Sequence, residues 1–244
     1  MKTADLSHHI SRRFNEDLER VRGQMLSMGG FVEQQLQNAI TALVEGDSTL
    51  AESVAQDDHK VNRMEVSIDE ECSRILATRA PTAGDLRMIV ATIKTITDLE
   101  RIGDEIEKVA LIAARLATVE RPTDRYREVK HLGRAVQGMV HETLDAFARL
   151  DAEAALRIAR TDRSIDEEYE SIQRQCVTFM MEDPRQIRRM LDLTWAARAL
   201  ERVGDHAKNI AEYVVYMVHG QDIRHTRPEE VEDRLRSRAN AGAA

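Results

Sequence analysis

One six-residue motif occurs twice in this chain of 244 residues. It reads Leu-Glu-Arg-Ile-Gly-Asp at residues 99–104 and Leu-Glu-Arg-Val-Gly-Asp at residues 200–205. The second copy follows the first by 101 positions, and a repeat of that period indicates two tandem halves, each the size of a small domain. We therefore expect one kind of folding unit to occur twice, and any site built on the motif to occur twice with it.

Both halves show the spacing of amphipathic helices. Apolar residues recur every three or four positions over long stretches, and with aromatic residues at 4% the chain lacks the β-branched and aromatic runs of strands. The spacing predicts six helices, over residues 7–45, 48–78, 84–119, 124–150, 151–182 and 185–219. Short connections force consecutive helices to run antiparallel. The predicted fold is all-α, with two tandem three-helix up-down-up bundles related by internal duplication.

Matching positions support the duplication. Asp47 and Asp151 can each cap the second helix of a half, and both they and the two cysteines, Cys72 and Cys176, are 104 positions apart. Because the repeated motif has an offset of 101, the turn before the third helix is predicted to be three residues shorter in the second half. The predicted units are a first bundle at 7–120, a second at 123–220, and a tail at 221–244.

Composition restricts the classes of function. A formal net charge of −8 argues against a nucleic-acid platform. No stretch approaches the ~20 apolar residues of a membrane span, and the first fifteen residues lack the apolar segment of a signal peptide, so a cytoplasmic protein is expected. The two cysteines fall in apolar stripes and are expected to be buried, as free thiols or, as the lesser alternative, as a disulfide.

Acidic side chains mark the candidate sites. In an antiparallel hairpin, residues at equal distances from the turn lie side by side. Each acidic pair of the motif is as far from its turn as a similar acidic or amide pair on the preceding helix. The turns lie at Pro81 in the first half and at Asp183-Pro184 in the second. The predicted clusters are Asp58, Asn62, Glu100 and Asp104 in the first half and Asp162, Asp166, Glu201 and Asp205 in the second.

Clustered carboxylates repel one another unless they stay hydrated, take up protons, pair with arginine or bind a cation. Hard oxygen ligands suit a divalent metal such as Mg²⁺, Mn²⁺ or iron, with zinc less favoured. The alternative is a solvated acidic face neutralised by nearby arginines, namely Arg63, Arg101, Arg163 and Arg202. Gly103 and Gly204, which are costly inside a helix, indicate close approach of another helix or an ion. Because Asn62 makes the first cluster less negative, the second is predicted to hold metal more tightly.

Other candidate sites carry weaker signals. His206 follows Asp205 and could join a metal shell, although a surface imidazole is the favoured interpretation. The single Trp195 is expected to be buried, and Met181 is expected among the core methionines. No glycine-rich phosphate loop, Gly-x-Ser-x-Gly elbow or zinc-spaced Cys/His set occurs in the sequence.

Several segments together resemble one protein family. They are the two copies of the repeated motif, Asn-Ile-Ala-Glu at 209–212, Met-Gly-Gly-Phe-Val-Glu-Gln-Gln at 28–35, and Gly-Gln-Asp-Ile-Arg-His at 220–225. The chain from about Leu6 to Arg227 is similar to the PhoU family of bacterial phosphate-signalling regulators. The resemblance implies two three-helix bundles side by side, a homodimer, and metal binding at the eight cluster positions in some members.

The resemblance also implies a non-enzymatic negative regulator of the phosphate (Pho) regulon. Such a protein couples the phosphate ABC transporter ATPase to a membrane sensor histidine kinase, restrains uptake and starvation signalling, and reaches the membrane only through these partners. The alternatives are a carboxylate metal-binding enzyme or metal-storage protein, which would need open coordination positions, and a purely structural bundle.

Overall fold

A computed structural model describes residues 3–79, 81–118, 126–224 and 226, and the regular structure within these residues is entirely helical. Its elements are α1 (Thr3–Glu45), α2 (Ser48–Thr78), α3 (Ala83–Ala117), α4 (Arg127–Arg149), α5 (Ala152–Glu182), the short 3₁₀ helix η1 (Pro184–Gln186) and α6 (Ile187–His219). The six predicted helices and the all-α class are confirmed. The predicted connection at 121–124 and the tail beyond residue 226 lie outside the described residues.

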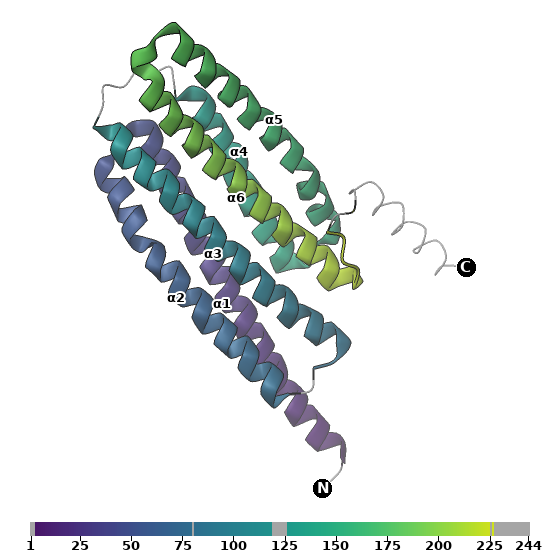
Figure 1. Cartoon of the computed structure of the whole chain (residues 1–244). Coiled ribbons are helices and arrows are strands. Elements are labelled where there is room, and N and C mark those ends of the chain that lie inside the picture. Colours follow the sequence, from purple (N-terminus) through teal and green to yellow (C-terminus); the bar gives the residue numbers. More distant parts are fainter. Residues whose placement is uncertain (1–2, 80, 119–125, 225, 227–244) are drawn as a thin grey trace.

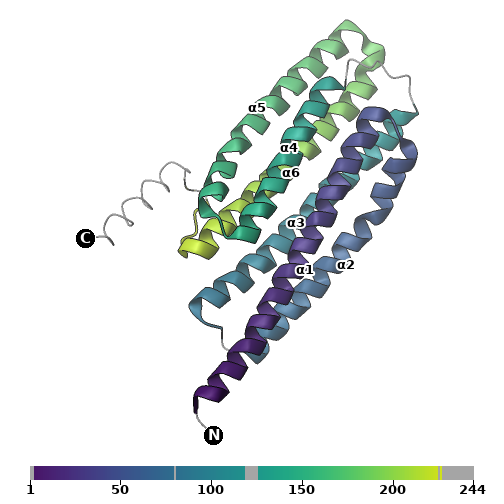
Figure 2. The same ribbon diagram turned by 180° about the vertical axis from the view of Figure 1, so that it is seen from behind.

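The helices form two bundles that pack side by side. Helices α1, α2 and α3 contact one another in the first bundle, as do α4, α5 and α6 in the second, and the bundles meet where α3 contacts α6 and α1 contacts α4. Figure 1 shows α2, α3, α6 and α5 as one layer, and Figure 2 shows α1 and α4 on the opposite side. The predicted pair of up-down-up bundles is thus confirmed, with α3 and α6 central.

The turns that start α2 and α5 repeat each other. The Asp47 and Asp151 carboxylates accept hydrogen bonds from the backbone N–H groups of Leu50 and Ala154 at 2.9 and 2.8 Å. The preceding residue adopts a left-handed conformation in both turns, with φ of 76° at Gly46 and 55° at Leu150. This conformation costs a non-glycine residue about 1–2 kcal/mol, so the second turn is the more strained of the two.

The hairpin turns differ in length as the sequence predicts. Helix α2 ends at Thr78 and α3 begins at Ala83, whereas α5 ends at Glu182 and η1 begins at Pro184. Asp183 alone separates α5 from η1, and its carboxylate accepts a hydrogen bond from the backbone N–H of Arg185 at 3.1 Å. The shorter turn therefore starts the last helical segment without an intervening loop.

Glycines allow α1 and α4 to pack closely. A Cβ atom on Gly29 would lie 2.5 Å from Leu144 Cδ2, and one on Gly133 would lie 3.0 Å from Ile40 Cγ1. A methyl group at either position would force the Leu144 or Ile40 side chain to shift, so both glycines favour the close packing of one bundle against the other.

Burial corrects two predictions at the α5–α6 end. Trp195 is 58% exposed and Met181 is 80% exposed, so the expectation that they lie in the core is wrong. Near this end, the buried face of α5 includes Ile172 and Cys176, and the buried face of α6 includes Met190. Met181 and Trp195 lie on other faces of these helices. The cysteine prediction holds, since Cys72 and Cys176 are buried free thiols.

Candidate metal centres

The antiparallel register of each hairpin brings the acidic helix faces together as predicted. A Cβ atom on Gly103 would lie 3.3 Å from Asp58 Oδ1, and one on Gly204 would lie 3.3 Å from Ile165 Cδ1. Gly103 and Gly204 therefore let α3 approach α2 and let α6 approach α5, which confirms the close approach expected from these positions.

The first cluster contains the four predicted residues, Asp58 and Asn62 from α2 and Glu100 and Asp104 from α3. Asn62 Nδ2 donates a hydrogen bond to Asp58 Oδ2 at 3.1 Å. The other oxygens of these two side chains, Asp58 Oδ1 and Asn62 Oδ1, are buried without a hydrogen-bond partner. Burial and the Asp104 charge raise the pKa of both Asp58 and Glu100. These oxygens are acceptors that a cation would satisfy.

Glu107 belongs to the first cluster, although the sequence reading did not include it. Burial raises its pKa, and so do the charges of Asp58 and Asp104. Because Glu100, Asp104 and Glu107 are spaced by four and three residues, they lie on one face of α3. That spacing was the available signal, and Glu107 gives the first cluster a fourth carboxylate in place of the one missing at Asn62.

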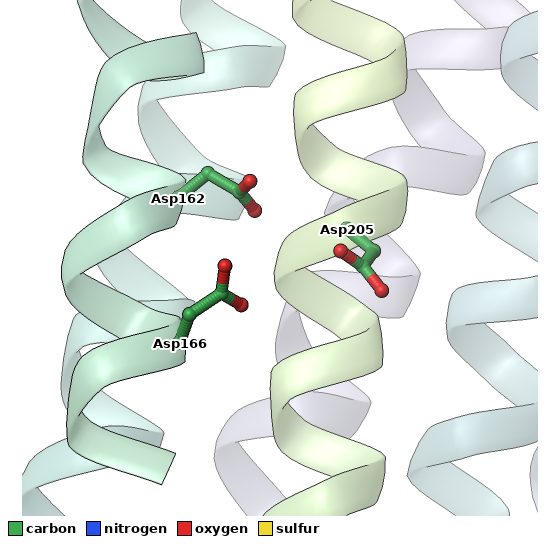
Figure 3. Close-up of side chains that lie close together, drawn as sticks. All are labelled: Asp162, Asp166 and Asp205. Carbon is green, nitrogen blue, oxygen red and sulfur yellow. The ribbon is translucent and has the colours of Figure 1, made fainter. Parts of the chain in front are cut away.

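The second cluster brings three aspartates within reach of one ion. Asp162 and Asp166 project from α5 toward α6, and Asp205 comes from α6 (Figure 3). One carboxylate oxygen from each lies within 4.8 Å of the others. Burial and the neighbouring aspartates raise the pKa of Asp166 and Asp205. This mutual repulsion is what a bound cation relieves.

Glu201, the fourth predicted member of the second cluster, pairs with an arginine. Its side chain is 7% exposed, and Oε1 accepts a hydrogen bond from Arg198 at 2.6 Å, while the buried Oε2 has no hydrogen-bond partner. Burial, and then the Asp205 charge, raise its pKa to about 7. Glu201 therefore changes protonation near neutral pH instead of joining the three aspartates as a permanent anion.

A lysine already occupies part of the second cluster. Lys208 Nζ donates a hydrogen bond to Asp162 Oδ2 at 2.6 Å. Burial by itself would lower the pKa of Lys208, but the hydrogen bond and the surrounding carboxylates raise it. Lys208 is 101 positions after Glu107, so the duplicated position carries opposite charges in the two halves. The ammonium of Lys208, which the spacing of the acidic residues does not predict at this site, occupies one oxygen of Asp162.

Two of the four arginines expected as counter-charges donate hydrogen bonds to glutamates outside the predicted clusters. Arg202 donates to Glu105 at 2.9 Å and Arg163 donates to Glu167 at 3.1 Å. Neither of these hydrogen bonds reaches a predicted cluster residue, so Arg202 and Arg163 do not neutralise the clusters by direct pairing. Among the described residues, Lys208 and Arg198 of the second half donate hydrogen bonds directly to predicted cluster carboxylates.

His206 is not a surface imidazole. It is 6% exposed, and its Nδ1 lies 2.8 Å from Asp98 Oδ1 across the contact between α6 and α3. Asn209 Nδ2 donates to the same oxygen at 3.1 Å. The favoured expectation for His206 is therefore wrong: it lies in the contact between the bundles, because α3 covers the face of α6 on which it projects.

The two clusters fit a hard divalent cation by the chemistry of their donors. Carboxylate and amide oxygens suit Mg²⁺, Mn²⁺ or Fe²⁺, and the three aspartates of the second cluster converge from two helices. Both clusters carry carboxyl groups whose pKa is raised by like charge and burial. Binding of a cation would therefore relieve the repulsion between these carboxylates.

Comparison with known proteins points to one family over both halves of the chain. The family model described as "PhoU domain" matches twice, at residues 25–113 and 129–214. The phosphate-specific transport system accessory protein PhoU homolog of Pseudomonas aeruginosa is 53% identical over 232 residues, or 93% of this chain and 96% of the relative. The phosphate-specific transport system accessory protein PhoU of Escherichia coli K12 is 46% identical over 239 residues, or 96% of this chain and 97% of the relative.

Solved structures agree in fold. The crystal structure of PhoU from Pseudomonas aeruginosa has a TM-score of 0.83 at 53% identity, covering 85% of this chain and 100% of that one. The crystal structure of the phosphate transport system regulatory protein PhoU from Streptococcus pneumoniae has a TM-score of 0.79 at 27% identity, covering 86% and 98%. The likeness thus spans both halves.

Proposed function

The chain belongs to the PhoU family, and from this membership we propose that it is a non-enzymatic accessory regulator of phosphate transport. It restrains phosphate uptake and holds the starvation response off when phosphate is plentiful. The observation that carries the proposal is that both copies of the family domain match and that named relatives align over more than nine-tenths of the chain.

We propose that the protein acts by binding two partners, the ATPase of the phosphate ABC transporter and a membrane sensor histidine kinase. It would bind them in the cytoplasm, as a homodimer. None of the described helices is both long enough and apolar enough to cross a membrane. We propose that contact with the membrane comes through the partners.

A pull-down tests this function. The tagged full-length protein is incubated with the purified transporter ATPase and the cytoplasmic part of the kinase, with and without inorganic phosphate. We expect capture of both partners, with the amount of captured kinase differing between the two conditions. Failure to capture either partner under both conditions would contradict the adaptor role.

We also propose that the acidic clusters bind a divalent cation in a structural or regulatory role. The support is the convergence of Asp162, Asp166 and Asp205 and the unpartnered oxygens of Asp58 and Asn62. The second cluster is the tighter site, because three carboxylates there are already within reach of one ion. Lys208 limits its affinity, because its ammonium holds one oxygen of Asp162 and places a positive charge beside the three aspartates.

A further inference from the structure

The free end of the second bundle carries an exposed apolar stripe. Ile187, Leu191 and Trp195 are spaced by four residues along α6 and are 43%, 39% and 58% exposed. Val177 and Met181, 50% and 80% exposed, belong to the last turns of α5, and the turn that follows α5 is at the top of Figure 1. A row of large apolar side chains left in solvent marks a binding surface more often than it marks a defect of folding.

The sequence that carries this stripe is strongly basic. Residues 185–198 contain four arginines and a single acidic residue, Asp192, in a chain whose net charge is −8. Asp192 is already paired with Arg115 of α3 at 2.8 Å. Arg188 is exposed and makes no ion pair with any residue that the structure describes. Positive charge is therefore available beside the apolar stripe.

A cavity lies next to the stripe. Its volume is about 840 Å³, and it is lined by the end of α3 and the start of α6, including Arg115, Arg185, Arg188 and Arg189. Asp183 and Asp192 are its acidic lining residues. Arg115 and Arg185 already pair with Asp192 and Asp183, so four guanidinium groups against two carboxylates leave the hollow with a net positive charge. That charge favours a ligand that brings carboxylates, because the planar guanidinium pairs with a carboxylate through two hydrogen bonds.

We propose that this surface, the stripe Ile187–Leu191–Trp195 together with the arginine-lined cavity, docks an acidic amphipathic segment of a partner protein. The partner's apolar side chains cover Trp195 and Leu191, and its carboxylates enter the cavity. Trp, Met and Arg are the residue types enriched at protein interfaces, and Lys, which is depleted there, is absent from residues 185–198. Trp195 is the expected anchor.

Two other occupants fit the surface less well. A two-fold contact with a second copy would bring two copies of the same basic surface together, and their net charges repel. An anionic bilayer would attract the positive charge, but lysine would serve it equally, and a flat lipid surface does not fill a cavity. Side chains of a partner protein satisfy both the stripe and the cavity.

The test rests on the proposed function, because its probes are the transporter ATPase and the cytoplasmic part of the sensor kinase. Binding of each to the full-length protein is measured by biolayer interferometry for the wild type, Trp195→Ala, and the double variant Arg185→Lys/Arg188→Lys. Val66→Ala is the matched control, since Val66 is 55% exposed on α2, in the other bundle. Vesicles of phosphatidylethanolamine with phosphatidylglycerol and analytical ultracentrifugation serve as the lipid and self-association arms. Circular dichroism checks that each variant is folded.

We expect Trp195→Ala to weaken binding of at least one partner by about 30-fold and the arginine-to-lysine variant by about fivefold. Val66→Ala should leave it unchanged. Partners that bind the wild type and Trp195→Ala equally would overturn the docking surface while leaving the proposed function in place. Failure of the wild type to bind either partner would contradict both. Vesicle binding that survives arginine-to-lysine exchange, or self-association lost in Trp195→Ala, with partner binding unchanged, would assign the surface to lipid or to a second copy instead.

Discussion

The two acidic clusters occupy equivalent places in the two bundles, yet they differ in how their charge is balanced. In the first, Asn62 donates a hydrogen bond to Asp58, and Glu107 adds a further carboxylate. In the second, three aspartates converge, while Lys208 and Arg198 supply cations from within the chain. Duplication has preserved the backbone and register of the site, whereas its charge has diverged at three positions: Asn62 and Asp166, Glu107 and Lys208, and Thr97 and Arg198.

This difference shows that a repeated motif does not guarantee a repeated site. The motif fixes Glu100 and Asp104 in one half and Glu201 and Asp205 in the other. What these carboxylates can bind is set by residues outside the motif, above all by the side chain one turn after its aspartate. That side chain is an anion in the first bundle and a cation in the second, so the bundles are expected to respond differently to pH, to metal and to substitution.

The largest expected difference between the two bundles is in how the free energy of unfolding depends on pH. The pKa of Glu201 is about 7 in the folded protein against an ordinary value of 4.5, so the folded state binds the extra proton between these values. The contribution of Glu201 to stability therefore falls as pH rises from 4.5 to 7. Glu201→Gln should remove this loss and raise the free energy of unfolding at pH 8 by up to about 3 kcal/mol, as measured by urea denaturation with a chelator present.

Glu100→Gln is the matched variant in the first bundle. Glu100 is only partly buried, and among the residues described no guanidinium donates a hydrogen bond to it. Glu100→Gln should therefore raise the free energy of unfolding at pH 8 by less than Glu201→Gln does. Equal gains for the two variants, or a loss of stability in Glu201→Gln at pH 8, would show that the buried glutamate does not distinguish the second bundle.

The second comparison concerns metal affinity. Lys208→Met removes the ammonium that donates to Asp162, so the second cluster should bind Mn²⁺ about tenfold more tightly in isothermal titration calorimetry. Lys108→Met is the control, because Lys108 Nζ donates to Glu105, which accepts from Arg202 of α6, instead of to a cluster residue. Its effect should stay within about twofold. A tenfold gain in both variants would mean that overall charge, and not the Lys208 contact, sets the affinity.

The smallest expected effect concerns the motif glycines. Alanine in a helix interior gains up to about 1 kcal/mol over glycine, set against the contact that the new methyl group makes. At Gly204 the contact is Ile165 Cδ1 at 3.3 Å, the rotatable end of a side chain, so Gly204→Ala should be neutral or mildly stabilising. At Gly103 it is Val61 Cγ1 at 3.2 Å and Asp58 Oδ1 at 3.3 Å, so Gly103→Ala should destabilise by about 1 kcal/mol. Thermal unfolding compares the two, and the opposite order would contradict this account of the packing.

The helices and their register could be predicted because they depend on local signals. Apolar spacing predicts each helix, Asp47 and Asp151 cap α2 and α5, and the position of each hairpin turn sets which residues lie level. Asp58 lies near Asp104, and Asp162 lies near Asp205, as counting residues back from each turn predicts. Such counting needs no knowledge of how the two bundles pack together.

The features that the sequence reading missed depend on the contact between the bundles or on side-chain reach. His206 is buried because α3 of the other bundle brings Asp98 to it, a contact between residues 108 positions apart. Trp195 is exposed because only part of the circumference of α6 is covered near its start. Lys208 reaches Asp162 across the hairpin through its long side chain. Helical periodicity shows which face is apolar, but it does not show which neighbour covers a polar position.

The most direct test is to titrate Mn²⁺ into two matched variants, Asp104→Asn and Asp205→Asn, and to measure binding by isothermal titration calorimetry at neutral pH. Each variant removes one carboxylate from one cluster and keeps the size of the side chain. The account predicts that Asp205→Asn loses the tighter of the two binding events and that Asp104→Asn retains it. Loss of the tighter event in Asp104→Asn, or equal affinities in both variants, would contradict the claim that the converging aspartates of the second bundle form the better cation site.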